Sequence, residues 1–218
     1  MGSSFTIEHN DEQYLISAKH VIESIEFENG DFIMIQIFHN GKWKNLNCQA
    51  YIHENDDVDI VVLKTSQVVF NKLPVKIGMK DLYLARDVYF LGFPYGMFTE
   101  DDDGQVNQKF PIPFVKKGIF SALITNNGVT SMYIDAHNNI GFSGGPVITI
   151  DKDNSVQITG VNVSYLKHDN VIDYEEQDDD GNLYDEKFEY HENSGIMEAH
   201  AIKHAIEIIE KNTIANTV

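Results

Sequence analysis

Short runs of β-branched and aromatic residues recur along this chain and are separated by turn residues. Residues 4–8 alternate apolar and polar side chains, which predicts a half-buried strand, and residues 14–17 follow a polar turn as its hairpin partner. A second hairpin is predicted for residues 32–38 and 43–50, because Asn40-Gly41 between two β-rich runs is a strong hairpin signal. The first fifty residues are therefore expected to form antiparallel strands.

The pattern predicts further short strands at residues 60–63, 73–77, 87–91, 117–123, 132–134, 147–150 and 156–163. Regular short strands with turn signals between them are typical of an all-β barrel or sandwich. Residues 18–22 predict one helical turn, and Met197–Lys211 predicts an amphipathic helix because its apolar residues recur at helical spacing. A boundary near residues 80–87 would divide the chain into lobes at 1–83 and 84–218.

Composition excludes several classes of partner. Apolar residues make up 42% of the chain and aromatic residues 11%, which is enough for a packed interior. The formal net charge of −18 argues against nucleic acid and anionic membranes as partners, because both would be repelled.

Cys48 is the single cysteine, so no intramolecular disulfide forms, and a buried, inert thiol is expected. No membrane span or signal peptide is visible, which predicts a cytoplasmic protein.

Two acidic tracts, Glu100–Gly104 and Asp178–Asn182, superficially resemble calcium-binding loops. The position of the closing Glu in a calcium loop falls on Phe110 after the first tract and on Lys187 after the second. Both tracts are therefore predicted to be acidic hairpin tips, and no metal site is expected.

The segment Gly141–Pro146, written GFSGGP, carries the candidate chemistry. Glycines around Ser143 allow a tight turn, which can aim the backbone N–H groups of Gly141 and Ser143 at one developing oxyanion. A hydroxyl nucleophile needs a base, and the base needs an orienting group. His20 closes a predicted strand, and Asp59 directly precedes a buried one, so both are candidates for these roles.

These motifs resemble the chymotrypsin-fold serine peptidases, and the segment Asp135–Pro146 resembles the HtrA type in particular. Ser17–Val21 is similar to the family's histidine motif and Asp59–Leu63 to its aspartate motif, while Leu91–Pro94 and Gly160–Asn162 resemble HtrA strands. The resemblance implies two antiparallel β-barrels with the site in the cleft between them and a C-terminal helix. It also implies a protein or peptide substrate, a His-Asp-Ser triad and no metal or cofactor.

The sequence also departs from the family pattern. No PDZ-like region follows the helix, and the first strand of the N-terminal barrel is missing, so a protein partner or oligomer is expected to complete that barrel. Phe142 stands where the family commonly has Asn or Asp. We expect its ring to pack beneath the loop, and we expect no activation by N-terminal cleavage, because Phe142 accepts no ion pair.

The resemblance places the primary specificity pocket between two segments: His137, Asn138 and Asn139 on one side, and Asn162, Val163, Ser164 and Tyr165 on the other. Neither segment holds a carboxylate, which argues against cleavage after Lys or Arg. Glutamyl endopeptidases of this fold have His where Asn162 stands, which argues against cleavage after Glu, although His137 leaves that specificity open. Val163 and Tyr165 favour small or medium apolar side chains.

The same residues suggest two alternatives to a serine endopeptidase. A protease-fold binding or regulatory module would keep the triad with little or no turnover, since a fold does not establish a function. An α/β-hydrolase esterase would need the order Ser, acid, His and alternating helices, and the chain has neither. Residues 167–193 predict a mobile, acidic hairpin beside the cleft, either an inert insertion or a gate.

Overall fold

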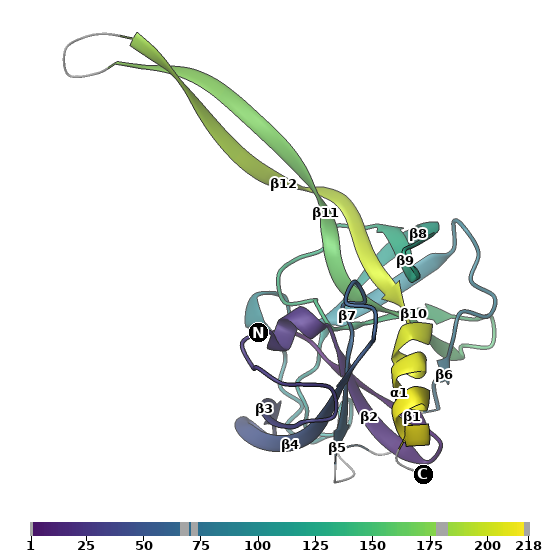
Figure 1. Ribbon diagram of the computed structural model, residues 1–218. Coiled ribbons are helices and arrows are strands. Elements are labelled where there is room, and N and C mark those ends of the chain that lie inside the picture. The colour runs from purple at the N-terminus through teal and green to yellow at the C-terminus, as the bar shows by residue number, and fades with distance from the viewer. Residues whose placement is uncertain (1, 66–69, 71–73, 178–182, 216–218) are drawn as a thin grey trace.

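The computed structural model describes residues 2–65, 70, 74–177 and 183–215. Within this part of the chain, two sheets and one C-terminal helix make up the fold (Figure 1). The first sheet has the strand order β1-β2-β5-β4-β3 and is entirely antiparallel. Its strands are β1 (Phe5–His9), β2 (Glu12–Ser17), β3 (Phe32–His39), β4 (Lys42–Ile52) and β5 (Val61–Thr65).

The second sheet has the order β10-β7-β8-β9-β12-β11-β6, with an added pairing of β10 to β11. Its strands are β6 (Lys76–Ile77), β7 (Asp87–Gly92), β8 (Phe114–Asn126), β9 (Val129–Asp135), β10 (Pro146–Ile150), β11 (Val156–Gln177) and β12 (Leu183–Ala201). Single 3₁₀ turns lie at η1 (Lys19–Ile22) and η2 (Pro94–Gly96). The expected all-β fold with a C-terminal helix is confirmed. The lobe division near residues 80–87 stays a prediction.

The helix prediction was wrong at its N-terminal end. Helix α1 spans Lys203–Ala215, whereas residues from Met197 to Ala201 belong to β12. Met197, Ala199 and Ala201 are all fully buried, so apolar residues alternate with period two here, and the strand pairs with both β9 and β11. This pairing outweighs the helical spacing that begins at Ile202.

Helix α1 packs against the first sheet and joins the two halves of the core. Ile202, Ala205, Ile208 and Ile209 form one buried cluster with side chains of β1, β2 and β5. A second cluster lies under β7 to β10 and includes Phe90 and Met132. Among the described residues, no helix has the length and apolar character needed to cross a membrane.

Cys48 belongs to a further buried cluster that covers the other face of the first sheet. It is a free thiol with 1% of its surface exposed, and burial raises its pKa to about 11. The predicted buried thiol is confirmed, and a pKa this high leaves almost no reactive thiolate at neutral pH.

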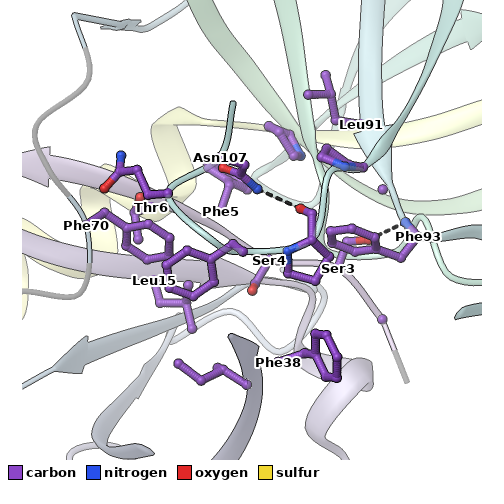
Figure 2. Close-up of a pocket in the computed structure, with 18 of the residues that line it drawn as sticks. Ser3, Ser4, Phe5, Thr6, Leu15, Phe38, Phe70, Leu91, Phe93 and Asn107 are labelled. Atoms are coloured by element: carbon purple, nitrogen blue, oxygen red, sulfur yellow. Dashed lines mark hydrogen bonds between the residues drawn. The ribbon is translucent and has the colours of Figure 1, made fainter. Parts of the chain in front are cut away.

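The first sheet does not close on itself within the described residues. Its edge strands, β1 and β3, are not paired with each other, and a cavity of about 560 Å³ is lined by residues of both. The lining is mostly apolar, and Figure 2 shows Phe5, Leu15, Phe38 and Phe70 among its side chains. Completion of this barrel by a protein partner or second copy stays a prediction.

The first acidic tract is more than an exposed hairpin tip. Thr99 bridges Ile112, so the tract does lie in a closed loop, but Asp101 is only 6% exposed. Its carboxylate accepts the N–H groups of Asn107 at 2.7 Å and Lys109 at 3.0 Å, which holds the loop together. The second tract lies outside the described residues.

The predicted hairpin over residues 167–193 is confirmed. Strands β11 and β12 stay paired from Lys167 opposite Asn193 to Gln177 opposite Leu183, and they project from the body as a twisted ribbon (Figure 1). The tip of this hairpin, residues 178–182, lies outside the described residues.

Candidate active site

The loop that carries Ser143 requires its glycines. Gly141 and Gly144 have φ angles of +102° and +85°, in the left-handed region that favours glycine. A Cβ at Gly141 would lie 2.2 Å from the carbonyl oxygen of Phe93, and one at Gly145 would lie 2.0 Å from that of Leu91. The backbone of the loop is therefore pressed against the end of β7, directly before β10 begins.

Two backbone N–H groups of this loop are free to bind an acceptor. Tyr95 donates its N–H to the carbonyl oxygen of Ile140 at 2.9 Å. Because N–H and C=O point in opposite directions in a trans peptide, the N–H of Gly141 is turned away from Tyr95. Within the described residues, neither this N–H nor that of Ser143 donates a hydrogen bond.

Ser3, which the sequence did not indicate as a site residue, forms hydrogen bonds with the loop that carries Ser143. Its N–H donates to the carbonyl oxygen of Ser143 at 2.8 Å, and its Oγ donates to that of Gly141 at 2.7 Å. The N–H of Phe93 donates to Ser3 Oγ at 3.1 Å (Figure 2), and Ser17 Oγ donates to the Ser3 carbonyl. Only the run of small residues Gly2-Ser3-Ser4 could have indicated close backbone packing.

His20 and Asp59 form a two-point contact. The backbone N–H of His20 donates to Asp59 Oδ1 at 2.9 Å, and His20 Nδ1 lies 2.6 Å from Asp59 Oδ2. The side chains are 41% and 27% exposed. The hydrogen bond to Asp59 raises the pKa of His20, with partial burial acting against it. Since Nδ1 faces the carboxylate, Nε2 is the ring nitrogen left to accept a proton.

The loop that carries Ser143 packs next to the segment that carries His20. A Cβ at Gly144 would lie 3.0 Å from the backbone nitrogen of Ala18, and one at Gly2 would contact both Val21 and the Ser143 carbonyl. No hydrogen bond joins Ser143 Oγ to His20 within the described residues. Catalytic hydrogen bonds of this kind often tighten only when substrate binds.

His200, a second residue that the sequence did not indicate, accepts a hydrogen bond from the backbone of Asp59. His200 Nδ1 accepts the backbone N–H of Asp59 at 3.1 Å. Burial lowers the pKa of His200, so the ring is neutral with its proton on Nε2, 3.9 Å from Glu198. His200 lies between Ala199 and Ala201 on β12. Nothing in the sequence links it to Asp59, because the contact joins the two sheets.

The expected pocket segments meet through a pair of amides. Asn138 and Asn162 exchange two hydrogen bonds of 3.0 and 3.1 Å, and both side chains are buried. Asn138 also donates to the carbonyl oxygen of Ser164. Val163 is buried at 4% exposure, whereas His137 is exposed. Asn139 and Tyr165 are partly exposed.

Phe142 and Lys116 pack against the segment that contains His137 and Asn139. Phe142 is fully buried and packs edge-on against Phe90 at 5.2 Å, which confirms the predicted packing of its ring. Lys116 Nζ lies 5.8 Å from the Phe142 ring centre and donates to the carbonyl oxygen of His137 and to Asn139 Oδ1. Burial lowers the pKa of Lys116.

One group among the described residues, His53, His204 and Glu207, lies close enough to share a metal ion. Its atoms are already engaged. His204 Nε2 accepts the N–H of Thr130 at 2.9 Å, so its proton is on Nδ1, which donates to Glu207 at 2.7 Å. A metal on Nδ1 would put a proton on Nε2 against the Thr130 N–H. The group therefore suits a hydrogen-bond network better than a metal.

Residues 2–156 match the trypsin-like peptidase domain. The chain belongs to this family. The HtrA-type protease AlgW with a decapeptide has a similar structure, with 22% identity, a TM-score of 0.56, and coverage of 96% of this chain and 50% of that chain. A second AlgW structure with a decapeptide is 19% identical, with a TM-score of 0.59, and the match covers 100% of this chain and 52% of that chain.

Rv3671c from M. tuberculosis H37Rv, in its inactive form, is 14% identical to this chain, with a TM-score of 0.53 over 100% of this chain and 83% of that one. The chain spans about half the length of the AlgW chains. A search of curated proteins found no match. These likenesses show the chymotrypsin fold that the sequence motifs predicted.

Proposed function

We propose that this peptidase is a serine endopeptidase with Ser143 as nucleophile, His20 as base and Asp59 as the orienting acid. The two-point contact between His20 and Asp59 carries this proposal, because it fixes the imidazole with Nε2 free. Ser143 lies on a glycine-held loop that packs next to the same segment. Membership of the trypsin-like peptidase family supports the assignment.

In the proposed mechanism, Ser143 Oγ attacks a peptide carbonyl while His20 Nε2 accepts its proton and then donates it to the leaving amine. Asp59 keeps the imidazole in one tautomer and stabilises the imidazolium. The free N–H groups of Gly141 and Ser143 would bind the oxyanion, and one such donor contributes about 3–4 kcal/mol in a comparable enzyme.

Ser143→Ala tests this function. We expect turnover of peptide substrates to fall by about 10⁶-fold, as for the nucleophile of a comparable triad. Ser155→Ala, at a partly exposed serine in the turn between β10 and β11, serves as the control and is expected to keep full turnover. A fluorophosphonate probe should label Ser143 alone. Normal turnover in Ser143→Ala would overturn the mechanism, and a folded wild type that neither reacts nor cleaves would favour the binding module.

Polypeptides are the proposed substrates, and the AlgW structures with bound decapeptides support this class. Asn138 and Asn162 satisfy each other's amides, and no carboxylate lies in the pocket segments, so we expect an uncharged residue before the scissile bond. Peptide libraries should show a preference for Val, Ala, Leu or Met. A dominant preference for Arg, Lys or Glu would contradict the pocket assignment.

The proposal also covers a partner for the first barrel and the cellular location of the protein. A protein segment or second copy is proposed to complete the first barrel along the open edges of β1 and β3. A cytoplasmic location rests on the single cysteine, Cys48. Light scattering of the purified protein tests the first statement, and fractionation of cells tests the second.

A further inference from the structure

The ribbon formed by β11 and β12 beyond the body, here called the arm, comprises residues 167–177 and 183–193. Within the described residues, each strand of the arm pairs only with the other. At about 3.3 Å per residue, the arm is roughly 35 Å long. An isolated two-stranded ribbon is marginally stable in water, so its persistence over this length calls for an explanation.

One face of the arm is apolar and aromatic. Ile172 lies directly opposite Phe188, and the two are 50% and 56% exposed. Tyr174 and Tyr190 lie two residues away on the same face, and the rings of Phe188 and Tyr190 stack at 6.0 Å. Alternation along a strand places all four side chains on one side, which leaves a hydrophobic strip uncovered.

The other face and the margins of the arm are acidic. Asp169 pairs with His191 at 2.6 Å and Asp173 with Lys187 at 3.7 Å. The two strands of the arm hold eight Asp and Glu against two Lys, which is a third of the formal net charge of −18.

This charge selects the kind of partner. A second copy of the arm, nucleic acid and anionic lipid would each be repelled. A positively charged partner would instead neutralise the carboxylates, and apolar side chains between its charges would cover the hydrophobic strip. An extended polypeptide with alternating basic and apolar residues fits both features, because its side chains alternate in the same period as those of the arm.

The arm is continuous with the candidate active site. Asn162, on the same strand β11, exchanges backbone hydrogen bonds with Gly144 and Gly145 of the nucleophile loop, at 2.7 and 2.9 Å. Beyond Asn162, no strand of the described residues pairs with this edge of β11. At the base of the arm, Asn193 donates to the carbonyl oxygen of Asn138. A chain bound in the cleft could therefore continue along the arm by strand addition.

We propose that the arm is a substrate-binding exosite for a basic, extended segment of the cleaved polypeptide, with Lys and Arg alternating with apolar residues. This inference rests on the proposed peptidase function and names its class of substrate. The acidic margins provide long-range attraction, and the strip around Ile172 and Phe188 provides apolar contact.

Binding to Ser143→Ala protein tests the exosite independently of turnover. The probe is a fluorescent twelve-residue peptide with alternating Lys and Leu, compared by anisotropy with a peptide that has Glu in place of Lys. We expect measurable binding of the basic peptide alone, weakened as salt rises from about 0.05 to about 0.5 M. Equal binding of both peptides, or none of either, would overturn the exosite.

Matched variants locate the contact. Four arm carboxylates are neutralised together and compared with four exposed carboxylates of the body, so that both proteins lose the same charge. The arm variant is Glu175→Gln, Glu176→Gln, Glu186→Gln and Glu189→Gln, and the control is Glu26→Gln, Glu28→Gln, Glu100→Gln and Asp102→Asn. We expect the arm variant to bind at least about tenfold more weakly and the control within about twofold of the parent. Equal losses would show a non-specific charge effect and contradict the proposal.

A third variant and a short substrate separate the two hypotheses. Ile172→Ser with Phe188→Ser should weaken binding while leaving charge unchanged. A five-residue uncharged peptide, too short to reach the arm, should be cleaved equally by wild type and by all arm variants. Cleavage of this peptide without binding of the basic one would reject the exosite alone, whereas binding without any cleavage would reject the catalytic proposal alone.

Discussion

At the scale of single residues, the contact of His20 with Asp59 predicts the pH dependence of catalysis. The hydrogen bond raises the pKa of His20 above its ordinary value of 6.5, and the base must be neutral to accept a proton. The value of kcat/KM should therefore rise with pH through a pKa above 6.5. Asp59→Asn should move this rise to lower pH and reduce turnover by about 10⁴-fold.

Values of kcat/KM measured from pH 5 to pH 9 on one uncharged peptide would check both expectations, because this range spans the ordinary histidine pKa of about 6.5. The same pair has a predictable effect on stability. Because the folded-state pKa of His20 is raised, its contribution is fully present below the unfolded value and is lost as pH rises through the folded value. An identical pH–rate profile in Asp59→Asn would contradict the assignment.

At the scale of elements, helix α1 stabilises the first sheet rather than supplying chemistry. Ile209 is 1% exposed and belongs to the buried cluster that includes Ile16 and Val62. We expect Ile209→Ala to reduce the free energy of unfolding by about 2–5 kcal/mol, because it removes buried methyl groups and leaves a cavity. Urea denaturation would measure the loss.

Lys203→Ala on the exposed side of the same helix is the control, with an expected change within about 0.5 kcal/mol. At temperatures where both variants are folded, activity should equal that of the wild type. A stable Ile209→Ala protein with reduced turnover would instead assign the helix a role in catalysis.

At the scale of the whole molecule, the candidate site depends on how the two sheets are held together. Ser3 accepts a hydrogen bond from Ser17 at the end of β2 and donates to Gly141 in the nucleophile loop. Ser3→Ala would leave the N–H of Phe93 and the carbonyl oxygen of Gly141 with only the long hydrogen bond of 3.4 Å between them, at a cost of about 1–3 kcal/mol. We expect slower fluorophosphonate labelling of Ser143 as well as lower stability.

Ser4→Ala is the matched control, because the neighbouring Ser4 is exposed. It should leave both the labelling rate and the unfolding midpoint unchanged. Labelling of Ser3→Ala at the wild-type rate would show that the loop keeps its conformation without this hydrogen bond.

The sequence by itself determined the features that depend on neighbouring residues. Alternating side chains and the Asn40-Gly41 turn predicted the hairpins, and the glycines around Ser143 predicted a tight loop. These signals are local, because strand pleating and positive φ angles are properties of a few consecutive residues. The motifs also indicated the family, which the match over residues 2–156 confirms.

Only the tertiary structure decided which distant groups meet. Ser3 lies 138 residues from Gly141 and His200 lies 141 residues from Asp59, and no local pattern encodes either contact. The start of helix α1 was misplaced for the same reason, since pairing with β9 and β11 holds Met197–Ala201 as strand. Hydrogen bonds between sheets depend on where whole elements pack, and packing is settled by the burial of many side chains at once.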